Sequence, residues 1–558
     1  MGSAGPAGGA SEPDPVQLEI SWARLMSIVD ESAIVLRRTS FSTVVRESND
    51  FACALVAPDG TTLAENSTGV PSFAGVMGRV MRTALTRIPL ENWRDGDLII
   101  HNDPWTNTGH TPDTTLISPI FMDGRLMAFA LNAAHKSDIG GRGATVEAKD
   151  TYEEGLRFDF CQLAKEGEDI ASVYDIIRAN VRMPDTFLGD LQAQISAAKV
   201  CGQRLVDFLR YQSLGDLGVL GRAIQERSEA VMRNKIAALP DGEYTHAVVA
   251  DGFDEPLTIQ ATVRVTGSDI EIDFDGTSPQ VKAGVNTVFN YAYAFACYTV
   301  KCVLDPVTPK NEGSYAPITV RIPEGCILNA KFPAPVMVRS MSGHFVAAAA
   351  LGALAQVVPD DVIADSGSCP GLRATISGID RNGKRFGQLL FPNGGMGAGA
   401  RADGHSCTGF PTNAGGEAVE VTESIAPVLF WERQYLPDSG GPGAQRGGLG
   451  QRVVIEYLGA ELATLLTRFD RVDHPAQGLL GGLPGRPAAL HLNDVPIPSK
   501  GRMEVRQGDV LRLDYAGGGG YGDPTTRDPA LIEQDVAEGL VSATAAAQYY
   551  GYRGGETA

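Results

Sequence analysis

Histidine is rare in this sequence, yet two histidines and one aspartate form a pattern that suits a metal ion. The chain has eight His among 558 residues, and the segment HNDPWTNTGHTPDTTL places His110 three residues before Asp113. His135 follows in NAAHKSDIGG. Two imidazoles and a carboxylate are suitable ligands for Zn²⁺, Mn²⁺ or Fe²⁺, and three protein ligands leave positions open for water or substrate. The pattern predicts a catalytic divalent metal site. The alternative interpretation is that Asp113 caps a turn and His135 bonds to backbone.

Two further residues are candidates for catalysis beside such a metal, which would acidify bound water and polarise a carbonyl. Asp138 follows His135 by three residues and is predicted to be an outer partner of the ligands or a general base. His344, in RSMSGHFVAAAALG, is expected in the first turn of a buried helix, where the helix dipole disfavours an imidazolium. It is therefore either a neutral residue facing substrate or a satisfied core histidine. Asp50, after Asn49, either lines the same cleft or ends a helix.

Other segments that resemble chemical motifs are weaker. The glycine-rich runs at 393–397 and 517–520 lack the Lys–Ser/Thr of a phosphate loop and the spacing of a dinucleotide fingerprint. They predict tight turns and close packing. Cys407 and His405 in GHSCTGF would allow a thiolate nucleophile, although two residues' spacing does not require their side chains to meet.

The elements around the metal motif predict how its residues meet. Residues 98–100 are apolar and read as a buried strand, and Pro104 ends it in a loop. TTLISPIF and RLMAFALNAAH read as two strands joined by a turn at 122–125. In such a hairpin, the residue that enters the first strand lies beside the residue that leaves the second. His110, Asp113 and His135 are therefore expected at one end of the hairpin.

The remaining patterns predict an α+β fold: a large, mixed, multi-lobed subunit with antiparallel sheets and buried helices. Apolar spacing predicts helices from Pro15 to about residue 37, at 75–86 and from Gln203 to about Leu239; buried helices at 289–304 and 343–357; a hairpin turning at Asp59–Gly60; a three-stranded meander at 241–277; and a β-rich region at 371–515. The expected organisation is a disordered tail at 1–14, an N-terminal α+β lobe with the metal motif at 15–200, a central α+β lobe at 201–370, a glycine-rich β-dominated lobe at 371–525 and a C-terminal helical tail at 526–558.

Charge and cysteine usage exclude several classes of protein. The sequence carries 47 Lys and Arg against 67 Asp and Glu, a net charge of −20, so its field repels nucleic acid. The eight cysteines are scattered without a C-x-x-C pair, which argues against a disulfide framework. Neither a signal peptide nor an apolar run of ~20 residues is visible. We expect a reduced, cytoplasmic protein that binds neither nucleic acid nor membrane.

Several segments together resemble the hydantoinase B/oxoprolinase family. NDPWTNTGHTPDTTLISPIF and AHKSDIGG resemble its signature, and RESNDFACALVAPDG, PKNEGSYAPITVRIPEG, LPDSGGPGAQRGGLGQ and AGGGGYGDPTTRDP look like further landmarks. The resemblance extends over about residues 15 to 552. The chain departs from the commonest form, G-G-T-H-L-P-D with H-H-A-D: it reads N-T-G-H-T-P-D, and Lys136 replaces the second histidine. These forms, with SGHF around His344, look closer to the acetophenone-carboxylase-like branch.

The resemblance implies a division of labour with a partner. An A-type ATP-binding partner uses ATP and Mg²⁺ to phosphorylate the carbonyl or enolate of a small substrate, and the B-type protein completes the reaction in a hetero-oligomer. In carboxylase relatives, two histidines and an aspartate of the matching motif hold a metal. These positions correspond to His110, Asp113 and His135 here.

Three functions follow as hypotheses. The first is ATP-dependent hydrolysis of a cyclic amide of the hydantoin, oxoproline or lactam type, in which water attacks the activated carbon and phosphate departs as the ring opens. The second is carboxylation of a phosphorylated ketone enolate, which consumes bicarbonate. The third is a non-catalytic scaffold that supports the partner.

Overall fold

The computed structural model describes residues 14–253 and 255–552. The predicted tail at 1–14 lies outside them except for Asp14, as do the last six residues of the predicted C-terminal tail. The α-helices are α1 Pro15–Thr39, α2 Thr43–Arg46, α3 Val76–Arg87, α4 Ala171–Asn180, α5 Pro184–Tyr211, α6 Gly218–Ile236, α7 Phe289–Leu304, α8 Glu312–Tyr315, α9 Ser340–Gly343, α10 Phe345–Leu354, α11 Val419–Ile425, α12 Pro529–Ala537 and α13 Ala543–Tyr550. Short 3-10 turns lie at Pro71–Phe73, Leu90–Asn92, Thr151–Glu154, Pro359–Asp361 and Pro524–Thr526.

A seven-stranded antiparallel sheet carries the metal motif, with the strand order β2-β1-β5-β4-β3-β6-β7. Its strands are β1 Phe51–Val56, β2 Thr62–Glu65, β3 Leu98–His101, β4 Asp113–Met122, β5 Arg125–His135, β6 Cys161–Lys165 and β7 Glu168–Asp169. Alternate side chains point to opposite faces of a strand. Cys53 and Leu55 therefore pack in the core beneath α1 and α5, while Ala52 and Ala54 pack against α3. The helix, the hairpin and the strands predicted for this part of the chain are confirmed.

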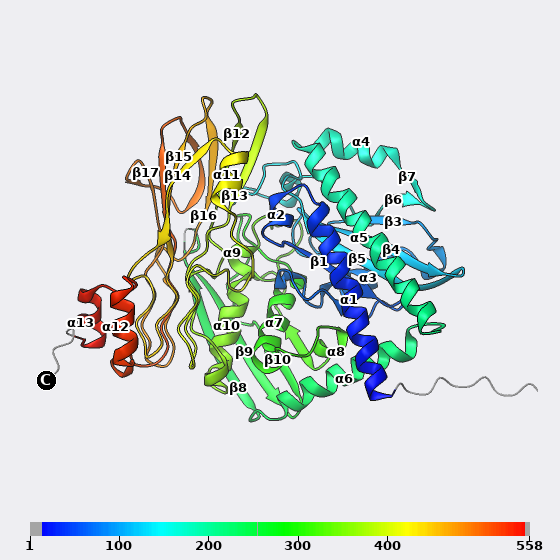
Figure 1. The fold of residues 1–558 in the computed structure, drawn as a ribbon, viewed down its shortest axis with the longest axis horizontal. Helices are drawn as coiled ribbons and strands as arrows, with labels where there is room; N and C mark the ends of the chain where they lie inside the picture. The colour runs from blue at the N-terminus through cyan, green and yellow to red at the C-terminus, as the bar shows by residue number, and fades with distance from the viewer. Residues whose placement is uncertain (1–13, 254, 553–558) are drawn as a thin grey trace, which may run out of the picture.

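The second sheet is four-stranded, in the order β11-β10-β9-β8, and packs against α10 (Figure 1). Its strands are β8 Gly242–Ala250, β9 Leu257–Thr266, β10 Asp269–Asp273 and β11 Ile318–Arg321. The predicted antiparallel meander is confirmed. The sequence pattern missed β11, which joins β10 in parallel after a connection of more than forty residues. A short edge strand of that kind has no neighbouring hairpin turn to mark it.

Two further sheets lie in the glycine-rich region. One has the order β13-β12-β16-β19 and the other β14-β15-β20-β17-β18, both antiparallel. Their strands are β12 Arg373–Ile379, β13 Arg385–Leu390, β14 Val428–Tyr435, β15 Gln451–Tyr457, β16 Ala463–Arg468, β17 Ala489–Leu492, β18 Val495–Pro496, β19 Lys500–Val505 and β20 Val510–Asp514. The predicted β-rich character and the closing helix pair, α12 and α13, are confirmed.

Helix α5 begins nineteen residues before the predicted start at Gln203, because Pro184 occupies its first turn. The apolar pattern of its first half is interrupted by Asp190 and Gln194, which are fully buried. Asp190 accepts hydrogen bonds from the backbone of Phe41 and Ser42. The first half of α5 was therefore not predicted, because buried polar residues interrupt the apolar spacing on which the prediction rests.

The buried apolar side chains of the described residues form five clusters. The largest runs from Leu18 to Cys369, a second runs from Leu372 to Ala516, and a third packs around α3 between Ala52 and Ala294. Two small clusters join α12 to α13, and Val44 to Phe391 and Ala414. The largest cluster ends at Cys369 and the second begins at Leu372, and the predicted division into lobes stays a prediction. The α+β class with several antiparallel sheets and buried helices is confirmed. None of the helices in the described ranges is long and apolar enough to cross a membrane.

Candidate metal centre and the cavity beside it

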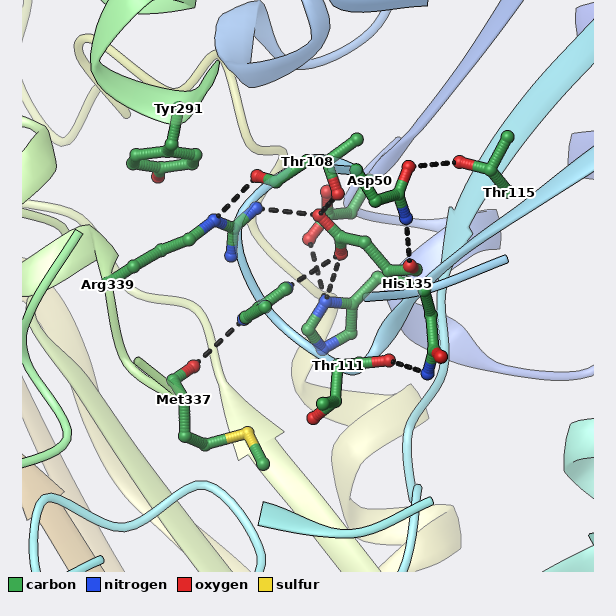
Figure 2. A network of polar contacts seen from close by, with 12 residues as sticks. Asp50, Thr108, Thr111, Thr115, His135, Tyr291, Met337 and Arg339 are labelled. Carbon is green, nitrogen blue, oxygen red and sulfur yellow. Dashed lines mark hydrogen bonds and ion pairs between the residues drawn. The ribbon is translucent and has the colours of Figure 1, made fainter. Parts of the chain in front are cut away.

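The hairpin of β4 and β5 brings the three predicted ligands together. Asp113 opens β4 and lies opposite His135, the last residue of β5, in the strand pairing. His110 stands on the loop just before β4. One potential ligand atom from each of the three residues lies within 4.8 Å of the others. The geometric part of the prediction is therefore confirmed, and Figure 2 shows the polar network around it.

Buried polar side chains shape the loop that presents His110. The Asn102 amide donates to the Thr111 carbonyl at 2.6 Å, and the Asn107 amide donates to the Asp113 carbonyl at 2.8 Å. Gly109 has a φ of +109°, and a Cβ there would lie 2.7 Å from Cδ of Arg339. Glycine is required at this position because both the backbone angle and the space exclude a side chain.

The ring orientation of His110 suits a metal ligand. Its Nδ1 lies 2.8 Å from the Met337 carbonyl, which can only accept, so Nδ1 carries a proton. Burial lowers the pKa of His110 to about 4, with Arg339 adding to the effect, so the ring is neutral at pH 7. The lone pair on Nε2 then points at Oδ1 of Asp113, 2.7 Å away. Two facing lone pairs without a proton between them are the arrangement that a cation relieves.

Asp113 divides its oxygens between two sets of partners. Oδ2 accepts from the Arg339 guanidinium at 2.6 Å and from the Thr108 hydroxyl at 2.9 Å. Oδ1 faces both histidines, with Nδ1 of His135 at 3.0 Å. Burial opposes ionisation, yet the Arg339 guanidinium holds the pKa of Asp113 well below its usual range. The donor set, a charged carboxylate and two imidazoles, fits a divalent transition metal.

Glu154 supports His110 through the backbone of Val336 and Met337, in the loop before α9. Its Oε1 accepts from the N–H groups of Val336 and Met337, both at 2.7 Å, and thereby positions the carbonyl that His110 contacts. Burial raises the pKa of Glu154 to about 8. Glu154 lies in no recognisable motif and was therefore not predicted from the sequence.

A cavity of about 570 Å³ opens beside the cluster. The ends of β1, β4 and β5, helix α7 and the loop before α9 line one wall, and one face of the β12–β13–β16–β19 sheet lines the other. Asp50 reaches this cavity from the start of β1, with Oδ2 3.6 Å from Nδ1 of His135. Burial raises the pKa of Asp50 to about 6, although His135 opposes that rise. Asp50 therefore lines the cleft, as one of its two predicted interpretations held.

Asp138 also lines the cavity, but other residues occupy its carboxylate. Oδ1 forms a 2.6 Å ion pair with Arg182, and Oδ2 accepts from the backbone N–H groups of Arg182 and Met183, just before α5. None of its hydrogen bonds reaches the three predicted ligands. In this geometry Asp138 fastens the loop after β5 to α5. Its predicted role as a general base stays untested.

His344 is the buried, neutral histidine that the sequence predicts, and it also borders the cavity. Its Nδ1 accepts from the Gly371 N–H at 3.0 Å, so Nε2 carries the proton and donates to the Tyr291 hydroxyl at 2.9 Å. Burial holds the pKa of His344 well below its usual range, and burial raises that of Tyr291. The Tyr291 phenol stays protonated, and its O–H has no acceptor among the described residues.

Two weaker candidates have structural explanations. Burial raises the pKa of Cys407 to about 12, and its Sγ lies 3.8 Å from the Leu449 carbonyl, so this residue is a thiol. The glycine-rich segments pack backbone to backbone: a Cβ at Gly395 would lie 1.7 Å from the Gly448 carbonyl oxygen. This is the close packing predicted for them.

The most informative residues that the sequence analysis missed are Arg339 and Tyr291. Arg339 bonds to Asp113 and lies with its guanidinium carbon 4.0 Å from the centre of the Tyr291 ring (Figure 2). Both residues lie about two hundred residues from the motif. In the sequence, Arg339 lies in the segment RSMSGHF, where only the histidine predicts a role at the site.

The chain belongs to the hydantoinase B/oxoprolinase family, whose model matches residues 14–524. It is 31% identical to the putative B-type polypeptide of a D-/L-hydantoinase from Pseudomonas sp. (strain NS671), over 96% of this chain and 95% of that protein. It is 28% identical to the beta polypeptide of the caprolactamase from Pseudomonas jessenii, over 96% of each. A match to 5-oxoprolinase 1 of Arabidopsis thaliana, at 28% identity, covers 91% of this chain and 42% of that longer protein.

Solved structures share the fold over nearly the whole chain. The crystal structure of the ATP-dependent caprolactamase from Pseudomonas jessenii superposes with a TM-score of 0.90 at 25% identity, covering 97% of this chain and 96% of that one. The nucleotide-free acetone carboxylase structure gives 0.86 at 17% identity, covering 97% and 80%. At that identity the second match shows the fold alone.

Proposed function

We propose that this chain is the B-type subunit of an ATP-dependent cyclic amide hydrolase and binds a divalent metal at His110, Asp113 and His135. One observation carries the proposal: the three ligand atoms converge within 4.8 Å beside a large cavity. The names of the relatives, the B component of a hydantoinase and the beta component of a caprolactamase, support the substrate class and the need for a partner.

The metal would lower the pKa of a coordinated water and polarise the substrate carbonyl. The chain's own residues position the ligands: Met337 orients His110, and Arg339 and Thr108 hold Asp113. The Tyr291 hydroxyl, held by His344, is placed to donate a hydrogen bond to an oxygen of the substrate. The cavity volume suits a small ring, since ligand pockets typically measure ~300–1,000 Å³.

An ATP-using A-type partner is the second part of the proposal. The glycine-rich segments that are close to nucleotide motifs in composition pack closely against backbone, and neither carries the Lys–Ser/Thr of a phosphate-binding loop. Phosphorylation of the ring carbonyl therefore belongs to the partner, in a hetero-oligomer. This chain then adds water to the phosphorylated carbon, and the ring carbon–nitrogen bond breaks to give an amine and an acyl phosphate. A second water hydrolyses the acyl phosphate to the carboxylate and inorganic phosphate.

The test measures metal content and activity together. Purified without chelator, the wild-type chain is expected to carry about one Zn, Mn or Fe per chain by elemental analysis, and His110→Ala is expected to lose it. With an A-type partner and ATP, the wild type is expected to open a hydantoin, 5-oxoproline or lactam ring, and His110→Ala is expected to be inactive.

The controls separate the competing functions. His246→Ala removes a histidine outside the cavity lining and should leave the metal in place. Product that contains carbon from labelled bicarbonate would identify a carboxylase instead. A metal-free wild type would contradict the metal site, and full activity of His110→Ala in the complex would identify the chain as a scaffold.

A further inference from the structure

The cavity has a positively charged wall in a protein whose net charge is −20. This wall is one face of the β12–β13–β16–β19 sheet. Arg373, Thr375 and Ser377 of β12 face the cavity, whereas Ala374 and Ile376 point into the second core. Because polar and apolar side chains alternate along the strands, the sheet has one polar face, and this face points into the cavity.

Two arginines at the centre of this wall are buried side by side. Arg373 on β12 and Arg468 on β16 are directly paired across the strands, and each is 8% exposed. Within 14–253 and 255–552, neither guanidinium forms an ion pair with a carboxylate. Burial lowers the pKa of each to about 10, so both remain cations at pH 7.

The protein satisfies these two cations incompletely. One Nη of Arg373 donates to the carbonyls of Leu372 at 2.9 Å and Pro392 at 3.2 Å and to the side-chain oxygen of Asn393 at 3.3 Å, and the guanidinium lies over the Phe391 ring. Arg468 donates to the Thr375 hydroxyl at 3.0 Å, and its Nε is buried without a partner. A buried charge without a counter-ion is costly, and two like charges side by side are more so. An anion between them would remove both penalties.

The pair shares its cavity with the candidate metal centre. Gly371, two residues before Arg373, bonds to His344, which holds Tyr291, and Tyr291 stacks on Arg339. Arg373 is also near enough to Asp50 for the two charges to interact. An anion bound by the arginines would therefore lie in the space where the substrate reacts.

We propose that Arg373 and Arg468 form the subsite that binds the phosphoryl group of the activated substrate and of the departing phosphate. Planar guanidinium groups match phosphate oxygens in geometry and charge, and two of them suit a dianion. The inference rests on the proposed function for the identity of the anion. The binding site itself rests only on the two buried, unpaired cations.

The experiment measures binding of inorganic phosphate to the full-length chain by titration calorimetry. Arg468→Gln is expected to weaken phosphate binding by at least about tenfold, since one charge-assisted contact is lost. Arg381→Gln removes the same charge from an exposed position beyond the end of β12 and should bind phosphate as the wild type does. Acetate serves as the carboxylate probe, and metal content is measured for every variant.

A structure of the wild type makes the result independent of the variants' folding. Crystals soaked in tungstate, a tetrahedral oxyanion, should show tungsten between Arg373 and Arg468. Absence of tungsten there, or equal phosphate affinity in Arg468→Gln, would overturn the subsite. Tighter binding of acetate than of phosphate would overturn the phosphoryl assignment. Phosphate binding by a chain without metal or hydrolase activity would support the subsite while rejecting the proposed function.

Discussion

Asp113 performs two tasks with one carboxylate. Oδ1 faces the two histidines, and Oδ2 is held by Arg339 and Thr108. Replacing a residue that orients a metal ligand typically costs ~10–100-fold in metal affinity or activity. Arg339 is therefore a positioning residue, because it contacts a ligand and stacks on Tyr291.

Replacing Arg339 tests this role. In Arg339→Gln, Oδ2 of Asp113 loses its charged partner, the carboxylate is free to rotate, and metal affinity is expected to fall by ~10–100-fold. Competition with a chelator of known affinity measures the change. Tyr291→Phe is the matched control: it keeps the ring under Arg339, so it should keep the metal while reducing turnover. Unchanged metal affinity in Arg339→Gln would show that Thr108 alone positions Asp113.

At the scale of elements, helix α5 supports the sheet that carries the ligands. Gln194 donates to the Thr114 carbonyl at 2.8 Å and accepts from the Lys136 ammonium at 2.6 Å. Lys136 follows His135, yet its ammonium points to α5 and not to the ligands, because successive side chains of a strand alternate in direction. This contact explains how a lysine is accommodated beside the motif.

Removing the amide should therefore destabilise the sheet. Gln194→Leu leaves the buried Lys136 ammonium without its partner, and we expect a loss of about 2–4 kcal/mol in the free energy of unfolding. Chemical denaturation measures it. Gln192→Leu makes the same substitution on an exposed face of α5 and should change stability little. Equal effects in the two variants would mean that the bond to Lys136 contributes nothing.

At the scale of the whole molecule, a few polar contacts join the two cores that line the cavity. Arg471 is fully buried, pairs with Asp365 and lies over the Phe345 ring. Asp251, at the end of β8, accepts from the backbone N–H groups of Val472 and His474, both at 2.8 Å. His110 and His135 line the cavity from the side of the first core, and Arg373 and Arg468 line it from the side of the second, so these contacts join the two walls of the cavity.

The Asp251 contact makes the junction sensitive to acid. Burial opposes ionisation, but the N–H groups of Val472 and His474, the His474 ring and nearby Lys500 lower the pKa of Asp251 below its ordinary 3.8. A lowered pKa stabilises the fold above about pH 4, and this contribution is lost as pH falls through the folded-state pKa. Asp251→Asn is expected to cost about 1–3 kcal/mol at pH 7 and to reduce the loss of stability below pH 4.

Thermal unfolding between pH 3 and pH 7 measures this difference. Asp473→Asn changes an exposed carboxylate in the same loop and should retain the wild-type pH dependence. If Asp251→Asn also retained it, the acid sensitivity would arise elsewhere in the chain.

The sequence by itself determined the hairpin and the ligand cluster. Period-2 alternation, a turn at 122–125 and the spacing of His110, Asp113 and His135 are local properties, since strand pairing across a short turn places its ends together. The same kind of local pattern identified α1, α3, α7 and the meander, and the family resemblance supplied the hypothesis about function.

Only the tertiary structure decided what surrounds the cluster. Arg339, Tyr291 and Arg373 come from segments more than 150 residues away, and no local pattern carries information about such contacts. Asp138 is close to His135 in sequence, but it forms an ion pair with Arg182, which lies just before α5. Asp50 lines the cavity. The pairing of Arg373 with Arg468 likewise arose from strand register. The packing of the two cores sets the positions of these side chains. It depends on the burial of apolar surface along the whole chain, so no local segment determines it.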